Sequence, residues 1–289
     1  MENRLYHLHT LSALHVGTGQ GVGAVDLPIA RSRASNLPIV PGSAIKGVLR
    51  DEFGNEHCEH HLSKENVKIL FGAENNDPAH AGAVAFGDAQ LLLLPVRSFA
   101  GTVAYATCPF ILKRYQRDAN LSFAIPELDK QAQVISDSLL LLGDKIALED
   151  LDMDAQKNAV VSEWAQAIAQ AIYPDDETWQ AELTQRFVVL PDDVFSFLAD
   201  TATEIRMRIK IDQKTRIVQN GALWSEENLP CETVLWGVFG VGASRDKNNP
   251  KSAQELNTLL PEKALNIQIG GKHTVGRGLC RLLIGKQGA

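Results

Sequence analysis

The sequence predicts an α+β fold, because strand-like and helix-like stretches alternate along the 289 residues without a long run of βαβ units. The clearest strand covers residues 205–212 (IRMRIKID), where apolar and polar side chains alternate strictly. The clearest helix runs from Asp154 through Ile172, where apolar residues recur on one side. No solenoid-type repeat is present, and no apolar run approaches the ~20 residues of a membrane-spanning helix.

The N-terminal half begins with an expected strand over residues 3–13, in which alternate side chains share a face. Four closely spaced glycines between residues 17 and 23 then predict a surface loop. Residues 37–53 have the pattern of a strand, a Pro41-Gly42 turn and a helix with Ser43 as its N-cap. Two further strands are expected at 83–96 and 101–107, followed by a helix at 109–118.

The C-terminal half contains an acidic block with helical periodicity, followed by an expected hairpin over residues 204–224. The hairpin's polar turn is Gln213–Thr215, and one face of its first strand is basic. Further strands are expected at 231–239, 265–270 and 279–284, with a glycine-rich stretch before the last of them.

The net charge of −7 would by itself argue against a nucleic-acid ligand, since an acidic surface repels phosphates. The charge is, however, unevenly distributed. Residues 135–200 hold 3 Lys and Arg against 14 Asp and Glu, a net charge of −11, whereas residues 201–289 hold 13 against 8, a net charge of +5. The basic C-terminal third is compatible with nucleic acid, and we expect the acidic block to face away from such a ligand.

Three segments have the composition of phosphate-binding sites. In residues 41–50 (PGSAIKGVLR) a helix begins after a glycine turn, so its free N–H groups favour an anion, and Lys46 and Arg50 share a face near that end. In residues 269–279 (IGGKHTVGRGL) the glycines permit close backbone approach, while Lys272 and Arg277 supply cations. The third segment is the basic face of the hairpin, formed by Arg206, Arg208, Lys210, Lys214 and Arg216.

Each of these segments also has a purely structural interpretation. The first could be a capped amphipathic helix with solvated cations, the second a glycine-rich turn needed for tight packing, and the third an ordinary solvated strand face. The glycine-rich stretch matches neither a Walker A loop nor a GxGxxG fingerprint. Three such segments in one chain nevertheless make phosphate binding the favoured interpretation.

Asp26 is the main candidate for chemistry, because it is the only acidic residue between Glu2 and Asp51 and lies on the glycine-rich loop. A lone carboxylate there could hold a divalent cation, act in proton transfer, or simply be a solvated turn residue. The His57–His61 cluster, which includes Cys58, matches no standard zinc spacing, and we expect an exposed loop. The four cysteines are far apart, as is typical of reduced thiols in a cytoplasm.

Four segments taken in order carry a resemblance to a known family: LHTLSALHVGTGQGVGAVDLPIAR, LPIVPGSAIKGVLRDEF, RIKIDQKTRIVQNGALWSEENLP and IQIGGKHTVGRGLCRL. Together they resemble the RAMP superfamily of CRISPR proteins, and most of all the backbone subunit that repeats along type III-B (Cmr) effector complexes. The likeness runs from about residue 4 to residue 284 and is weakest over 120–200. It implies a single domain (1–289) with a modified RRM-like (ferredoxin-like) core, an inserted helical subdomain at about 135–200, and a protruding β-hairpin thumb at about 204–224.

The resemblance also implies which residues serve the function. Copies of such subunits stack as a helical filament along a CRISPR RNA, and the aspartate of the loop after the first strand is implicated in cutting the target RNA. Here that position is Asp26, in GAVDLP. The expected RNA-binding residues are Ser43, Lys46, Arg50, Arg216, Gly270, Gly271, Lys272, Thr274, Gly276 and Arg277. Arg216 and Lys272 are added from the basic segments, and the resemblance implies the others.

The chemistry expected from this resemblance is attack of an RNA 2′-hydroxyl on the adjacent phosphate, a reaction unavailable to DNA. A single carboxylate per site gives poor support to a two-metal mechanism. We therefore expect Asp26 to position a divalent cation, Mg²⁺ or Mn²⁺, or the 2′-hydroxyl itself, with His15 and Glu227 as secondary candidates for helpers. Products would carry a 2′,3′-cyclic phosphate or its hydrolysed form.

The partners implied are CRISPR RNA, a single-stranded target RNA, further copies of the chain and other Cmr-complex subunits. No secretory signal or membrane segment is apparent, so a cytoplasmic location without membrane contact is expected. Two alternatives remain open. One is a non-catalytic scaffold of the same superfamily that coats guide RNA, and the other is a guide-processing endoribonuclease, which is disfavoured because no His/Tyr/Lys acid–base constellation is apparent.

Overall fold

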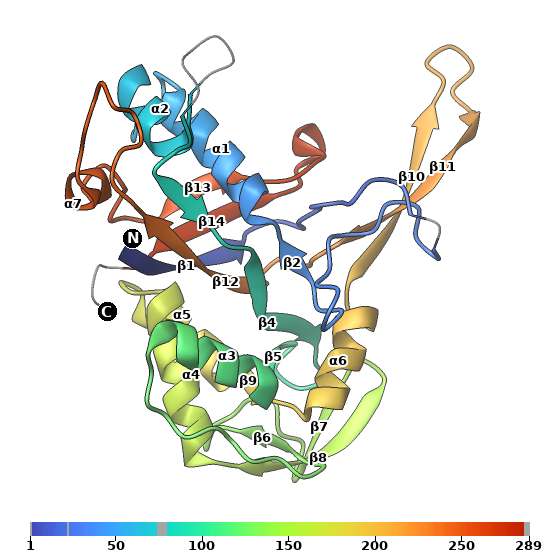
Figure 1. The fold of residues 1–289 in the computed structure, drawn as a ribbon. Coiled ribbons are helices and arrows are strands. Elements are labelled where there is room, and N and C mark those ends of the chain that lie inside the picture. The colour runs from blue at the N-terminus through green and yellow to red at the C-terminus, as the bar shows by residue number, and fades with distance from the viewer. Residues whose placement is uncertain (1, 22, 74–79, 286–289) are drawn as a thin grey trace.

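The computed structural model describes residues 2–21, 23–73 and 80–285, which form one large sheet, a separate hairpin and surrounding helices (Figure 1). In spatial order the sheet contains β13 (Leu265–Gln268), β14 (Leu279–Ile284), β1 (Glu2–Thr10), β12 (Val234–Val241), β4 (Ala89–Arg97), β5 (Val103–Thr107), β9 (Phe187–Val189), β6 (Ala132–Val134), β8 (Leu151–Lys157) and β7 (Lys145–Leu148). Two short strands extend it, since β2 (Ile39–Val40) pairs with β4 and β3 (Val84–Phe86) pairs with β12. Its pairs are antiparallel except β5–β9 and β6–β8. The fold is therefore mixed α and β, as the sequence predicts.

The helices divide between the two ends of this sheet (Figure 1). They are α1 (Gly42–Gly54), α2 (Lys64–Phe71), α3 (Pro109–Ala119), α4 (Ala159–Ile172), α5 (Glu177–Gln185), α6 (Asp192–Thr201) and α7 (Ala253–Asn257). Helices α1 and α2 lie near β13, β14, β1 and β12, whereas α3 to α6 lie around β4, β5 and β9. Among the described helices, none is both long and apolar enough to cross a membrane.

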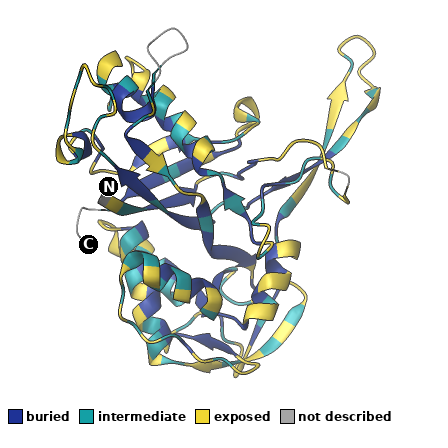
Figure 2. Cartoon of the chain, viewed as in Figure 1, coloured by how far each residue is buried: buried dark blue, intermediate teal, exposed yellow. Residues whose placement is uncertain are grey.

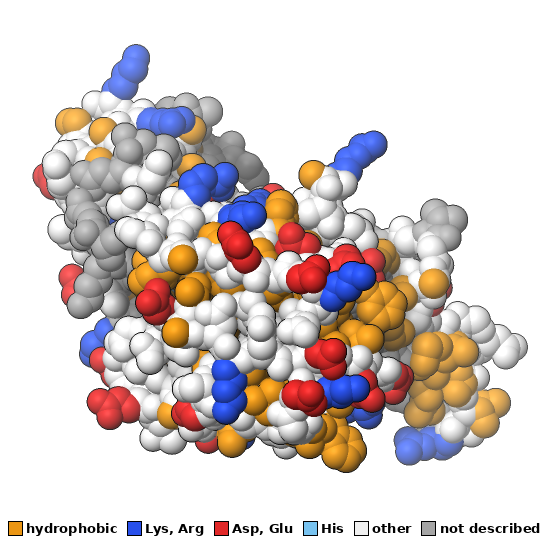
Figure 3. Space-filling model, turned by 90° about the horizontal axis from the view of Figure 1, so that it is seen from below, with side chains coloured by type: hydrophobic (Ala, Val, Ile, Leu, Met, Phe, Trp, Pro, Cys, Tyr) orange, Lys and Arg blue, Asp and Glu red, His pale blue; other side chains and the backbone are white. Residues whose placement is uncertain are grey.

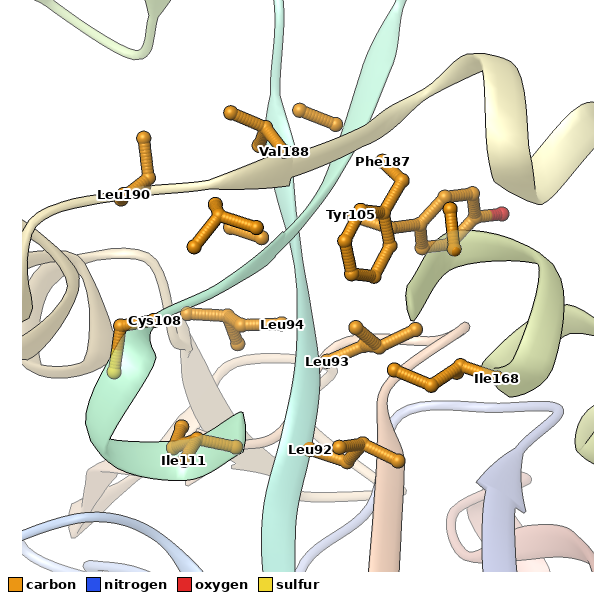
Figure 4. Close-up of a cluster of buried hydrophobic side chains, with 14 of the residues drawn as sticks. Leu92, Leu93, Leu94, Tyr105, Cys108, Ile111, Ile168, Phe187, Val188 and Leu190 are labelled. Atoms are coloured by element: carbon orange, nitrogen blue, oxygen red, sulfur yellow. The ribbon is translucent and has the colours of Figure 1, made fainter. Parts of the chain in front are cut away.

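Two hydrophobic cores correspond to these two ends. One packs β4, β5 and β9 against α3, α4 and α6, and Figure 4 shows Leu92, Leu93 and Leu94 of β4 inside it, close to Phe187 and Val188. Consecutive leucines are tolerated there because both faces of β4 are covered. The other core packs β1 and β12 against α1 and α2. The two cores meet along β4 and β12, which are neighbouring strands.

The expected helix over 154–172 is shorter at its N-terminus than predicted. Residues 151–157 form β8, and α4 begins after an Asn158 side chain that caps it by accepting from Val160 N at 2.9 Å. The strand has its own period of two, because Leu151, Met153 and Ala155 alternate with acidic or amide residues. The four-residue apolar spacing that predicts the helix begins only at Val160, inside α4, and Ala155 belongs instead to the strand pattern.

The acidic segment 135–200 contains helices α4, α5 and α6, but also strands β7, β8 and β9, so it is not purely helical. These strands continue the sheet beyond β5, which ties the segment to the rest of the molecule through β9. In the view from below, Figure 3 shows acidic side chains scattered over this face together with basic and hydrophobic ones.

The hairpin consists of β10 (Glu204–Ile211) and β11 (Val218–Asn228), an antiparallel pair that projects from the body (Figure 1). It extends four residues past the expected end at 224, and those four residues at its base are buried. Figure 2 shows that most of its outer part is exposed. Its turn is held by the Asp212 side chain, which accepts hydrogen bonds from Lys214 N at 2.9 Å and Thr215 N at 2.8 Å.

Candidate functional site

The Asp26 side chain is exposed and is held in place at the base of the hairpin by Ser225 of β11. Asp26 Oδ2 accepts from Ser225 N and from Ser225 Oγ, both at 2.7 Å, and Asp26 N donates to Ser225 Oγ at 2.9 Å. The neighbouring Leu27 forms a parallel bridge with Glu226. The glycine-rich loop is thereby fixed to the hairpin at the one residue to which the sequence assigns chemistry.

These hydrogen bonds decide the protonation state of Asp26. The backbone N–H of Ser225, followed by its hydroxyl, lowers the pKa of Asp26 below its ordinary value. A carboxylate with a lowered pKa is a weak base but a good acceptor and cation ligand. The arrangement therefore suits Asp26 to holding a cation or orienting a hydroxyl more than to removing a proton.

His15 follows the first strand and is buried beneath the same loop. Its Nδ1 lies 2.7 Å from the carbonyl oxygen of Glu227, which can only accept, so Nδ1 carries the proton. In the neutral ring Nε2 is then left as an acceptor. Gly17 packs closely against the ring, because a Cβ at this position would lie only 2.7 Å from Nε2 and would force the imidazole to shift.

Glu227 does not have the free carboxylate that a chemical helper needs. Its Oε1 accepts from Arg31 Nη2 at 2.7 Å and from Thr203 Oγ1 at 3.1 Å, and its Oε2 accepts from Ile29 N at 3.0 Å. The side chain is almost fully buried. Glu227 is therefore a positioning residue that fastens the loop after Asp26 to the hairpin base and to the end of α6.

Arg277 also differs from expectation, because it is buried instead of exposed to a ligand. Its Nε lies 3.1 Å from Oε1 of Glu226, whose side chain is 0% exposed. Arg208 of β10 approaches the other oxygen of Glu226, with its Nε 3.9 Å from Oε2. Sequence reasoning missed both Ser225 and Glu226. The available signal was a pair of adjacent acidic residues, 226 and 227, just after the basic hairpin that the sequence predicts.

The glycine-rich stretch 270–278 packs against the loop that begins at His15. Gly271 N donates to His15 O at 2.9 Å, and Gly270 has a φ of +87° with His15 O only 2.3 Å from where a Cβ would be. Tight packing therefore explains Gly270. Thr274 and Gly276 belong to the exposed turn, and Lys272 Nζ lies 5.9 Å from the ring centre of Trp224. The parts of this stretch that remain accessible to a ligand are residues 271–276.

The N-terminus of α1 is capped by another element and not by Ser43. Pro41 occupies the N-cap position without a side-chain hydrogen bond, and Gly42 N donates to Asp88 Oδ1 at 2.9 Å. Ser43 is therefore exposed in the first turn of the helix. Lys46 is half-buried and its Nζ donates to Val84 O at 3.0 Å, while burial, followed by the nearby Arg50, lowers the pKa of Lys46. Arg50 is half-buried on the same helix.

The hairpin cations fall into two groups. Arg206 and Arg208 are paired with Glu204 and Glu226, whereas the other three lie at the exposed end of the hairpin. Arg216 lies in the turn with a φ of +60° and donates its N–H to Asp212 O at 2.9 Å. The free basic charge of the hairpin is thus concentrated near its tip.

The loop with the histidine cluster connects α1 to α2 and is mostly exposed. Within residues 2–21, 23–73 and 80–285, no group of three or more His, Cys, Asp or Glu side chains is arranged to hold a metal ion. Asp26 therefore belongs to no group of three or more such side chains in this part of the chain. Mg²⁺ often binds through one or two carboxylates together with substrate phosphates and water, so an exposed aspartate such as Asp26 could hold such an ion together with a phosphate-bearing ligand.

Comparison with known proteins places this arrangement in a family. The family model of the RAMP superfamily matches residues 7–281. The chain belongs to the RAMP superfamily. Its fold is also similar to solved RAMP structures, including oligomeric Cmr4 from Pyrococcus furiosus, with a TM-score of 0.73 and 27% identity over 99% of this chain and 98% of that one.

Two full-length relatives of this RAMP protein are similar in sequence. The CRISPR system Cmr endoribonuclease Cmr4 of Pyrococcus furiosus is 33% identical, covering 98% of this chain and 96% of the relative. The CRISPR system CMR subunit Cmr4 of Saccharolobus solfataricus is 24% identical, covering 96% and 94%. A type III-B Cmr-β complex bound to cognate target RNA contains a chain that shares the fold, with a TM-score of 0.73 at 19% identity over 98% of this chain and 97% of that one.

Proposed function

We propose that this RAMP protein is the repeated backbone subunit of a type III-B CRISPR effector and cleaves target RNA paired to a guide. The observation that carries the proposal is the exposed Asp26 carboxylate, kept ionised by Ser225 on a loop fixed to the hairpin base. The full-length similarity to a Cmr endoribonuclease supports the same activity. A scaffold that only coats guide RNA would have no need of this carboxylate, which favours the enzymatic alternative.

The proposed chemistry is attack of a 2′-hydroxyl on the adjacent phosphate, with positioning as the main contribution of the protein. Asp26 would accept a hydrogen bond from the 2′-hydroxyl, or hold a divalent cation through the oxygen that Ser225 does not engage. Such a cation, Mg²⁺ or Mn²⁺, would stabilise negative charge on the phosphate. His15 Nε2 is the remaining candidate acceptor for the hydroxyl proton. The products would carry a 2′,3′-cyclic phosphate or its hydrolysed form.

Guide binding is proposed to be independent of sequence. Backbone N–H groups and cations contact phosphates, while base pairing selects the target. The accessible candidates are Ser43 and Arg50 on α1, Lys272 and Thr274 in the glycine-rich turn, and Arg216 at the hairpin tip. Lys46 retains two further N–H donors besides the one given to Val84 O.

The finer architecture follows the same proposal. The strands around β1 would be the modified RRM-like core, residues 135–200 the inserted subdomain, and β10–β11 the thumb that interrupts pairing along a filament of copies. The acidic segment lies at the opposite end of the molecule from the hairpin tip (Figure 1), which is compatible with its facing away from the guide. Other Cmr subunits would complete the assembly.

The test is cleavage of a complementary target by the assembled complex with Asp26→Asn. We expect the single-turnover cleavage rate to fall by at least about 100-fold, because the cation ligand or hydroxyl acceptor is lost. Guide binding should stay within about twofold of the parent. A 2′-deoxy substitution at the cut site should also stop cleavage.

Glu255→Gln is a matched control. Its carboxylate is likewise exposed and accepts from one serine, through Ser252 N at 2.7 Å and Ser252 Oγ at 2.8 Å, but it caps α7 instead of serving the hairpin base. Cleavage should be unaffected by this change. Undiminished cutting by the Asp26→Asn complex would refute the catalytic assignment and leave the scaffold alternative.

A further inference from the structure

A cationic cavity of about 290 Å³ lies where the loop before β2 meets β4 and α3. It is separate from the residues that the sequence assigns to RNA. Its lining consists of Arg31, Ser32, Arg33, Ser35, Leu37, Pro38, Ile39, Asp88, Gln90, Leu91 and Arg114. Three arginines and one acidic residue among these side chains make it a candidate site for an anion.

The three arginines are not equivalent. Arg31 is committed to the protein, because its guanidinium donates to Asp200, Glu227 and two backbone carbonyls. Arg33 and Arg114 have no carboxylate at ion-pair distance within the described ranges. Arg33 is exposed, and Arg114 is half-buried with its guanidinium over the Phe110 ring. Arg114 interacts electrostatically with Asp118 on the next turn of α3, but neither Arg114 nor Arg33 has a carboxylate at ion-pair distance in the described part of the chain, so both guanidinium groups keep donors for a ligand.

The other polar groups of the cavity are compatible with an anion. Asp88 is the one acidic side chain in the lining, and its Oδ1 accepts from the N-terminus of α1. The Gln90 amide has a buried Oε1 without a partner, so the amide can turn its NH₂ group toward a ligand instead. Burial is the first cause that lowers the pKa of Arg114, which means that its charge is incompletely solvated. A bound anion would compensate for that loss of solvation.

The wall of the cavity includes Arg31, which lies on the same stretch of chain as Asp26. Arg31 follows Asp26 by five residues, which limits the distance between their Cα atoms to ~18 Å. Arg31 Nη2 also lies 2.7 Å from Oε1 of Glu227, two residues after the serine that holds Asp26. If an RNA strand passes Asp26, a phosphate only a few nucleotides further along the strand can reach the cavity.

We propose that Arg33 and Arg114 form a phosphate-binding subsite for RNA, a few nucleotides from the position cut beside Asp26. The proposal rests on the proposed function in taking RNA as the ligand. Both guanidinium groups can bind phosphate oxygens in pairs, and the Ser32 hydroxyl can donate a further hydrogen bond. Guide and target strands share this chemistry, so the strand is identified by the experiment.

The experiment uses the guide-loaded complex with Arg33→Gln and Arg114→Gln combined, in an Asp26→Asn background that leaves the target intact. One arm measures the affinity of the protein for guide RNA, and the other measures the affinity of the loaded complex for a complementary target. Losing two phosphate contacts should weaken binding in one arm by roughly tenfold and reduce its salt slope by about 1.4 to 1.8. The arm that changes identifies the strand.

Lys113→Gln is the matched control, because it removes one positive charge from an exposed position next to Arg114 on α3. It should leave the affinity for guide RNA and the affinity for target RNA within about twofold of the parent values. Unchanged affinity in both arms for the double variant would overturn the proposal. The proposal would also be overturned if copies failed to assemble while RNA affinity stayed the same. That result would mean that the cavity binds a carboxylate of a neighbouring copy and not an RNA phosphate. Asp26-dependent cleavage is measured separately, so a failure of the proposed function can be told apart from a failure of the subsite at Arg33 and Arg114.

Discussion

Arg277 Nε and Glu226 Oε1 lie 3.1 Å apart in an ion pair that is almost completely buried. It joins the glycine-rich turn to β11, one residue after the serine that holds Asp26. Three consecutive residues of β11 thus contact three different segments. Ser225 binds the Asp26 loop, and Glu226 binds the glycine-rich turn. Glu227 binds the chain at Ile29 and Arg31. The hairpin base therefore sets the relative positions of the proposed guide-binding and cutting segments.

This arrangement predicts different consequences for the two cations of the glycine-rich turn. Lys272→Gln should reduce the salt slope of guide binding by about 0.7 to 0.9, because a lysine without a carboxylate partner releases a counterion when it meets a phosphate. Arg277→Gln should leave that slope unchanged while lowering the free energy of unfolding by about 2 kcal/mol, since it strands the Glu226 carboxylate. Guide titrations over a range of salt, with urea unfolding alongside, measure both quantities.

The Glu226→Gln variant provides the control for that interpretation. If Arg277 acts through Glu226, the double variant should be little worse than either single one, giving a coupling free energy of about 1 kcal/mol or more. Additive effects on stability, or a reduced salt slope for Arg277→Gln, would instead indicate that Arg277 contacts RNA directly.

Gly270→Ala should disrupt the glycine-rich turn, since a Cβ at this residue would lie 2.3 Å from His15 O. We expect a loss of at least about 2 kcal/mol in the free energy of unfolding, from the clash and the positive φ combined. Gly276→Ala is the matched control, because its φ of +76° is similar but nothing lies within 4 Å of the added Cβ. Its cost should be only about 1 kcal/mol. Equal losses in thermal or urea unfolding would contradict the packing role of Gly270.

Glu227→Gln tests whether this carboxylate positions the loop or takes part in the chemistry. The variant should lose about 2 kcal/mol of stability, because Arg31 would keep only the exposed Asp200 as an ionic partner. Asp200→Asn should cost less than about 0.5 kcal/mol, as expected for an exposed pair member. Cleavage by the folded Glu227→Gln complex should fall less than about threefold; a much larger loss at unchanged stability would give Glu227 a chemical role.

Local pattern was sufficient for much of the fold. The period of two in IRMRIKID corresponds to β10, the stretch after Cys108 to α3, and LCRLLI to β14. The misassigned start of α4 shows the limit, because Ala155 fits the strand's period of two but the sequence prediction assigns it to the next helix as its first apolar residue. The pairing of β8 with the adjacent β7, and with β6 at residues 132–134, decides for the strand.

The sequence predicted which residues are candidates for the site but not what surrounds them. An isolated acid in a glycine-rich loop marked Asp26, but nothing near Arg277 in sequence showed that Glu226, 51 residues away, neutralises it. The sequence pattern favoured Ser43 as the N-cap of α1. In the structure Asp88, which directly precedes β4, supplies the acceptor for Gly42 N instead. Burial and ion pairing are tertiary properties, so exposed and internal cations look alike in a sequence.

His7 makes folding stability depend on pH in a way that one substitution can isolate. It lies in the middle of β1, where its Nε2 is 2.8 Å from the hydroxyl of Tyr115 on α3, and burial lowers its pKa from 6.5 to about 4. Between these values the unfolded chain binds a proton that the folded chain does not, so this stability contribution is present above pH 6.5 and decreases as the pH falls toward 4.

The expected size of this effect is about 2 kcal/mol between about pH 7.5 and about pH 5. His7→Gln should remove this pH-dependent contribution. The difference in unfolding free energy between parent and variant should therefore narrow by about 2 kcal/mol as the pH falls from about 7.5 to about 5. His57→Gln, at an exposed loop position, should leave the parent's pH dependence unchanged. Urea unfolding at the two pH values measures the difference, in which carboxylates common to both proteins cancel. Parallel curves for parent and His7→Gln would mean that His7 becomes protonated within the folded sheet, and that its contact with Tyr115 tolerates the charge.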